Sequence, residues 1–300
     1  MERIMAYIKR SILRRNILHK LSQGINRISA KGVFIGIILT VFTVIQVYPL
    51  IFLVFFSLKN NDEIFSGNAM GPPNNVVWNN YARALMGGNV AKYFMNSLII
   101  AIFTIIIVAI LSSMASYALT RMRWKLSKTV MTTFTMGLMI PVHVALLPLF
   151  IILGRIKLMN THWALILPYA AFGLPIAILI LSSFMQTIPV EIEECACLDG
   201  CSIYMIFFRI IVPLIKSGLV TVVIFTFLSA WNELMFAITF ANSKSVRPLT
   251  AGITSLVGEY FSEWGPIGAG LVIATLPTII MYLFMSNEVQ KSLIAGAIKG

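Results

Sequence analysis

Six long apolar blocks, almost free of charge, constrain this chain more than any other feature. Each is long enough to cross the hydrocarbon core of a bilayer as a helix. Only 11% of the 300 residues are charged, whereas soluble domains carry about 25%. Lipid offers the backbone no hydrogen-bond partner, and the alternation typical of a membrane barrel is absent, so we expect an all-α membrane protein. The expected spans are residues 33–58, 96–119, 129–153, 163–184, 217–240 and 267–286.

Positive charges fall unevenly between the segments that flank these blocks. Sixteen of the 23 Lys and Arg residues precede the first block, follow the last, or lie in the second and fourth connections. The positive-inside rule therefore predicts a multi-pass membrane protein with both termini in the cytoplasm. Because this bias accounts for most of the net charge of +12, membrane lipid is an expected partner and nucleic acid is not.

The blocks divide the chain into four parts. Residues 1–32 form a basic cytoplasmic segment, which we expect to lie as an amphipathic helix on the inner leaflet. Residues 33–92 hold the first span and the longest exterior loop, with a short helix from about Trp78 to Leu85. Residues 93–286 form the membrane core, and residues 287–300 a cytoplasmic tail. The basic region is too long for a cleavable signal peptide.

Prolines lie within or at the ends of the spans, where they remove a backbone donor and can kink a helix. Ordinary bundle packing and a change of tilt between states both remain open as explanations. The prolines are Pro49, Pro141, Pro148, Pro168, Pro175 and Pro277.

A short acidic segment with three cysteines, "ECACLDGCSIY", interrupts the apolar second half of the chain. Pro189 suits the first turn of a helix, and Glu191, Glu193 and Glu194 then lie near the positive end of its dipole. Gly200 offers a stop, after which an apolar helix runs into the fifth span. We therefore expect a short helix at the cytoplasmic face.

This segment resembles the cytoplasmic signature of ABC importer permeases: Glu-Ala-Ala, three residues, Gly, nine residues, Ile, any residue, Leu, Pro. The matching positions are Glu194, Ala196, Asp199, Gly200, Ile210 and Pro213. Cys195 replaces the first alanine and keeps a small side chain, and Val212 replaces the leucine. The stretches "LMNTHWALILPY", "FLSAWNELMFA" and "RPLTAGI" are similar to the maltose-type permeases of carbohydrate uptake, and the likeness covers about residues 34–290.

The resemblance implies a type I ABC importer permease fold, with residues 93–286 as its type-1 core and a cytoplasmic coupling helix. The implied docking residues for an ATPase are Glu191, Glu194, Cys195, Ala196, Asp199 and Gly200. Implied partners are a pair of ATP-binding subunits, a second, different permease and an exterior solute-binding protein. The chain has no phosphate-binding G-x-x-x-x-G-K-[ST] motif, so ATP and Mg would be used by the partner, and no cofactor or enzyme activity is expected here.

Inside the spans, Glu233 is the notable carboxylate, and with Asn232 it is a candidate for the translocation path or for a packing hydrogen-bond cluster. Packing is favoured for the small polar residues Asn96, Ser97, Ser112, Ser113 and Ser116. His143 is expected to be packed or hydrogen-bonded rather than to relay protons, and Trp163 and Tyr169 to anchor at the interface.

Three other functions fit the sequence less well. The cysteines Cys195, Cys197 and Cys201 lack a fourth ligand nearby, so a metal site is disfavoured. An ion-coupled secondary transporter would need more buried charge than Glu233 supplies. A membrane-embedded enzyme would need a convergent set of catalytic side chains that the spans lack.

Overall fold

The computed structural model describes residues 30–258 and 262–297, with side chains from residue 32 to 284 within those ranges. The described residues form helices and no strand, as the sequence predicted. The predicted amphipathic helix before residue 30 lies outside them. The α-helices are α2 (Ala30–Ser57), α3 (Asn61–Phe65), α4 (Asn79–Ala82), α5 (Val90–Thr120), α6 (Ser127–Gly137), α7 (Leu146–Arg155), α8 (Trp163–Met185), α9 (Glu191–Leu198), α10 (Ile203–Ile206), α11 (Val212–Leu214), α12 (Lys216–Asn232), α13 (Met235–Phe240), α14 (Leu249–Thr254) and α15 (Trp264–Ala297). Shorter turns of other helix types are η1 (Arg83–Gly87), η2 (Val142–Ala145) and η3 (Phe207–Ile211).

The chain divides into two compact units, residues 1–54 and 55–300. The described part of the first unit is the larger share of α2, whose side chains from Val33 to Leu50 are exposed, as suits a helix surrounded by lipid. The second unit contains the other helices and all the sites discussed below.

Helices α5, α8 and α12 pack together as the centre of the second unit. Small residues allow the close approach of α5 and α8: a Cβ on Gly173 would lie 3.3 Å from Val108, and Ser116 Oγ donates to the Ile178 carbonyl at 3.0 Å. The packing role predicted for the small polar residues of α5 is confirmed, because all five are buried.

Two of the six predicted spans are not continuous helices. Four described helices are long and apolar enough to cross a membrane, and six spans result only if each of two bent helix pairs counts as one. The third predicted span breaks between α6 and η2, where the two parts are bent by 91°. The fifth, predicted to run to Phe240, ends as α12 at Asn232, because Glu233 is extended. A bend of 74° also separates α12 from the helical segment Ile203–Leu214 before it.

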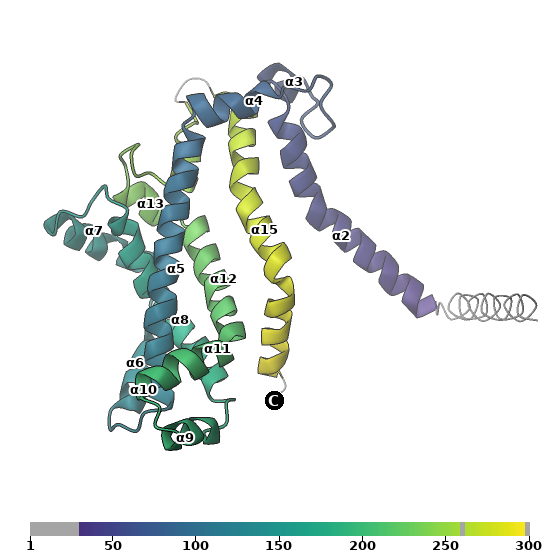
Figure 1. Cartoon of the computed structure of the whole chain (residues 1–300). Helices are drawn as coiled ribbons and strands as arrows, with labels where there is room; N and C mark the ends of the chain where they lie inside the picture. The colour runs from purple at the N-terminus through teal and green to yellow at the C-terminus, as the bar shows by residue number, and fades with distance from the viewer. Residues whose placement is uncertain (1–29, 259–261, 298–300) are drawn as a thin grey trace, which may run out of the picture. The chain divides into compact units, whose positions relative to one another are not determined.

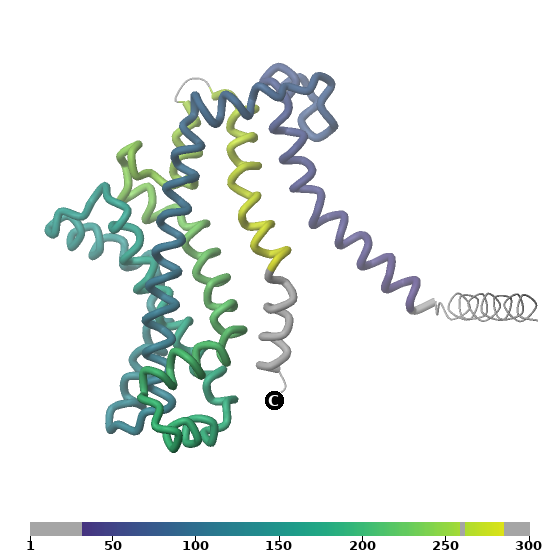
Figure 2. Tube along the Cα trace, viewed as in Figure 1, coloured from purple at the N-terminus to yellow at the C-terminus, as the bar shows by residue number. Residues whose placement is uncertain are grey.

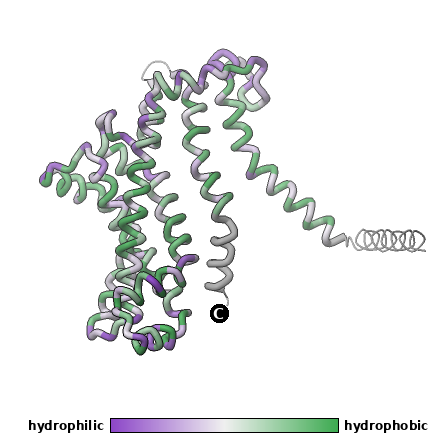
Figure 3. The backbone as a smooth tube through the Cα atoms, viewed as in Figure 1, coloured by the Kyte–Doolittle hydropathy of each residue, from purple (hydrophilic) through white to green (hydrophobic). Residues whose placement is uncertain are grey.

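Different short helices lie at the two ends of α5. Helices α9 and α10 lie at the C-terminal end of α5, whereas α4 lies at its other end (Figures 1 and 2). Apolar residues dominate the length of α5 between these ends (Figure 3). The short helix predicted from about Trp78 to Leu85 is confirmed as α4 and η1, and its exterior location stays a prediction.

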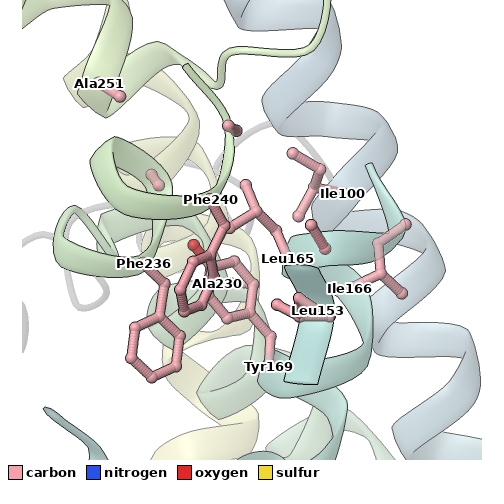
Figure 4. Close-up of a cluster of buried hydrophobic side chains, with 12 residues drawn as sticks. Ile100, Leu153, Leu165, Ile166, Tyr169, Ala230, Phe236, Phe240 and Ala251 are labelled. Carbon is pink, nitrogen blue, oxygen red and sulfur yellow. The ribbon is translucent and has the colours of Figure 1, made fainter. Parts of the chain in front are cut away.

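A buried cluster joins α8, α12 and α13. It includes Leu165, Tyr169, Phe236 and Phe240, which Figure 4 shows converging from these elements. Ile100 of α5 also belongs to this cluster. This cluster surrounds the break after α12, which is described below.

Candidate functional site

Helix α9 is defined by its two ends. Its first turn holds the three predicted acidic residues, and Pro189 lies just before that turn rather than within it. At the other end Gly200 has a φ of +80°, which glycine adopts without a Cβ penalty. Two hydrogen bonds close the end, from Gly200 N to Cys197 O and from Cys201 N to Ala196 O, both 3.0 Å. This is a Schellman motif, and it stops the helix sharply at the predicted glycine.

An ion pair holds α9 against the end of α5. Arg121 Nε lies 3.1 Å from Glu193 Oε1, and these side chains are only 8% and 12% exposed. The Tyr117 hydroxyl also donates to Glu193 Oε2 at 3.0 Å. Arg121 Nη2 donates to the carbonyls of Met185 and Ile188, at 2.5 and 2.6 Å. Arg121 therefore connects the end of α5, the end of α8 and the start of α9.

Sequence reasoning missed this anchor. It counted Arg121 only as a cytoplasmic charge and Glu193 only as an acidic residue in the first turn of a helix. Seventy-six residues separate Tyr117 from Glu193, so no local spacing connects them. The available signal was weaker: an arginine directly after an apolar block, and a carboxylate on the same predicted side of the membrane.

The two faces of α9 differ. Ala196 is 8% exposed and packs in a cluster of this chain's own apolar residues, so it does not form the outer surface on which we expected it. At about 100° per residue, Glu194 and Leu198 point away from that cluster. Leu198 is 88% exposed, although it is apolar. Sequence reasoning also missed this leucine.

The remaining predicted docking residues surround this outer face. Glu191, Cys195 and Asp199 are exposed, as is the turn at Gly200. Of the other cysteines, Cys197 is exposed and Cys201 is partly buried. Within the described residues, no three His, Cys, Asp or Glu side chains converge on a site that could hold a metal ion.

The other predicted site residues lie at the break after α12. Glu233 accepts hydrogen bonds from Phe236 N at 2.9 and 3.0 Å, from Ala237 N at 3.2 Å and from the Tyr169 hydroxyl at 2.8 Å. It thus caps α13 and ties it to α8. Asn232 is exposed, and its amide donates to the Leu228 carbonyl at 2.9 Å. The interfacial role predicted for Tyr169 is wrong, because this residue is buried against Phe236 and Glu233.

A polar network lies at the opposite end of α5 from α9. Asn96 donates its amide to the carbonyls of Ser245 and Arg247, at 3.0 and 2.9 Å. Its oxygen is therefore the atom that accepts from His162 Nε2, at 3.1 Å, which fixes the histidine tautomer. Burial lowers the pKa of His162. The network joins the loop before α8 to the loop before α14.

Comparison with known proteins decides the family. Residues 110–291 match the model of the family described as "Binding-protein-dependent transport system inner membrane component". The chain belongs to this family. The matched range contains α9, the Arg121 anchor and both broken spans.

Individual relatives support the same assignment for this permease. It is 32% identical to the trehalose transport system permease protein SugB of Mycobacterium tuberculosis, over 84% of this chain and 92% of the relative. It is 30% identical to the diacetylchitobiose uptake system permease protein NgcG of Streptomyces coelicolor, over 87% of each chain. A chain of a bacterial ABC transporter involved in the import of the acidic polysaccharide alginate has the same fold, with a TM-score of 0.76 at 20% identity, covering 85% of the permease and 95% of that chain. The predicted type I importer fold is confirmed.

Proposed function

We propose that the permease is the membrane subunit of an ATP-driven, binding-protein-dependent importer of oligosaccharides or other carbohydrates. The names of the trehalose and diacetylchitobiose relatives, which it matches over most of its length, support the carbohydrate substrate. Two ATP-binding subunits would use ATP and Mg. A second, different permease would complete the pathway, and an exterior solute-binding protein would deliver the sugar. In this arrangement the chain lies in the bacterial cell membrane with both termini in the cytoplasm.

The observation that supports this function best is the rigidly held α9 with an exposed mixed face. Glu191 and Glu194 can bind basic or amide groups of an ATPase. Leu198 can enter an apolar pocket that lies between those groups on the ATPase surface. Leu198 is 88% exposed, so its burial against a partner surface would remove apolar area from water, which is favourable. The small Cys195 would permit close approach beside it.

The anchor gives a physical route from α9 to the spans. A force on α9 reaches α5 through the Glu193–Arg121 pair. It reaches the end of α8 through the hydrogen bonds of Arg121 to the Met185 and Ile188 carbonyls. Closure of the ATPase pair could therefore tilt both helices without unfolding α9, because an ion pair with few exposed atoms resists solvent screening.

Substitution of Leu198 by Gln tests the docking. Loss of one buried leucine contact is worth about 2 kcal/mol, so we expect co-purification of the ATPase subunits to weaken by roughly 10- to 50-fold. ATP-dependent uptake of trehalose or diacetylchitobiose by vesicles should fall with it. Leu126→Gln is the matched control, since this leucine is 58% exposed in another loop predicted to be cytoplasmic.

Equal retention of the ATPase by both variants would argue against α9 as the docking element. Uptake that continues in vesicles without ATP, driven by an ion gradient, would indicate a secondary transporter instead.

A further inference from the structure

The first break interrupts the third predicted span. Helix α6 has 11 residues and rises about 16 Å, only half of a hydrocarbon core of about 30 Å. Its last turn has backbone hydrogen bonds of the 3₁₀ type, between residues three apart in sequence: Leu138 N donates to Thr135 O, and Met139 N donates to Met136 O. Pro141 then has no N–H, and the chain turns by 91° into η2 and α7. A helix end therefore lies within a predicted span, where hydrocarbon offers backbone carbonyls no hydrogen-bond donor.

The second break interrupts the fifth predicted span. Helix α12 has 17 residues and rises about 26 Å before Glu233 takes an extended conformation. The Glu233 carboxylate then bonds two backbone N–H groups and the Tyr169 hydroxyl. With three donors, this carboxylate acts as a positioning group for α13.

The two breaks meet at Phe236. The His143 ring, from η2, contacts the Phe236 ring edge-to-face, with centroids 6.2 Å apart and planes at 90°. The Tyr169 ring stacks on another part of Phe236 at 6.3 Å, and Figure 4 shows these two aromatic side chains together. Two interruptions far apart in sequence are therefore joined at one place.

Lipid is an unfavourable environment for the two helix breaks that meet at Phe236. Irregular backbone at membrane depth is tolerated where it is buried in protein or lines a water-filled cavity. His143 and Asn232 are nevertheless exposed at the breaks. Imidazole and amide groups can exchange hydrogen bonds with water and with sugar hydroxyls, which hydrocarbon cannot offer.

We propose that His143 and Asn232 line the water-filled sugar route in the exterior half of the membrane, with Glu233 as the positioning residue behind them. This inference rests on the proposed import function and names where the route crosses this chain. It differs from the sequence-based expectation, which paired Asn232 with Glu233 and treated His143 as packing.

Thiol accessibility tests the proposal. His143→Cys and Asn232→Cys would be made singly in the full importer, in right-side-out vesicles. Sulfonatoethyl methanethiosulfonate, which does not cross membranes and reacts with thiols in water, would be added outside. The native cysteines are on the predicted cytoplasmic side, so the unmodified permease is the blank. Ile102→Cys is the matched control, because Ile102 is 50% exposed on the continuous helix α5.

We expect His143→Cys and Asn232→Cys to be labelled at least 10-fold faster than Ile102→Cys. Labelling of both at the rate of Ile102→Cys would overturn the proposal, whether lipid or a partner chain covers the site. If His143→Cys fails to reach the membrane, Asn232→Cys decides the outcome alone. The import function is tested separately, since labelling does not depend on uptake. An importer with the native permease that shows no ATP-dependent uptake would refute it.

Discussion

Glu193 and Glu233 are both partly buried carboxylates of the permease, but they are held by different chemistry. Glu193 faces the charged Arg121 at 3.1 Å and the Tyr117 hydroxyl, at the cytoplasmic end predicted for α5. Among the described residues, the donors to the Glu233 side chain are neutral, two backbone N–H groups and a tyrosine. A hydrogen bond or ion pair with a charged partner is stronger than one between a carboxylate and a neutral donor. Helix α9 is therefore held to α5 by an ion pair, whereas the break after α12 is stabilised separately by hydrogen bonds from neutral donors.

The largest expected effect comes from breaking the ion pair. Arg121→Gln leaves the Glu193 carboxylate buried without its cation, which costs about 3 kcal/mol for pairs this little exposed. We therefore expect amide hydrogen exchange in residues 191–198 to become faster by roughly 100-fold. ATP hydrolysis by the complex should lose its coupling to uptake.

Arg123→Gln is the matched control, because Arg123 is exposed two residues further along. The double variant Arg121→Gln/Glu193→Gln should be less destabilised than the sum of the single variants, since the unpaired charge is then absent. Additive effects would show that the two residues do not act as a pair.

The break after α12 is tested by shortening Glu233. Glu233→Ala leaves Phe236 N and the Tyr169 hydroxyl without their acceptor, at a cost of about 1–3 kcal/mol. Glu233→Gln keeps one acceptor oxygen and should cost less. The melting temperature of the detergent-purified complex measures both. Equal melting temperatures for the alanine and glutamine variants would remove the capping role and weaken the contrast with Glu193.

Sequence reasoning succeeded where one segment carries its own signal. The spans that became α5 and α8 follow from long apolar runs, and α9 follows from acidic residues before a glycine. Proline was ambiguous: Pro168 and Pro175 lie inside the continuous α8, whereas Pro141 marks a 91° break. The sequence could not separate these cases, because the effect of a proline on a membrane helix depends on the groups that pack around it.

The candidate sites were harder to predict for the same reason. Arg121 and Glu193 are distant in sequence and meet only after α5 and α8 have packed. The contact of His143 with Phe236 likewise needs two broken helices to meet. Ala196 matched the family signature, yet it packs inside the chain, because a signature records residue type and not the direction of a side chain.

A smaller effect is expected at the C-terminal end of α9. Gly200→Ala places a side chain at a φ of +80°, where a Cβ costs about 1 kcal/mol. No atom lies within 4 Å of that Cβ, so the cost is conformational rather than steric. Gly200→Asn should cost less, because asparagine tolerates this region. Exchange of the Cys201 amide, which donates to Ala196 O, reports the change, and an alanine effect equal to that of asparagine would contradict it.

The smallest effect is a pH dependence at the network opposite α9. Burial lowers the pKa of His162, so the folded permease binds this proton less readily than the unfolded chain, whose pKa is about 6.5. Stability from this residue is complete above that value and is lost as pH falls below it toward the folded pKa. The melting temperature should therefore fall more between pH 7.5 and 5.5 for the native permease than for His162→Gln. The glutamine amide can still donate to Asn96, as Nε2 does now, so the two proteins differ mainly in the titrating group. Equal falls would show that the loops before α8 and α14 are held without any contribution from the neutral histidine.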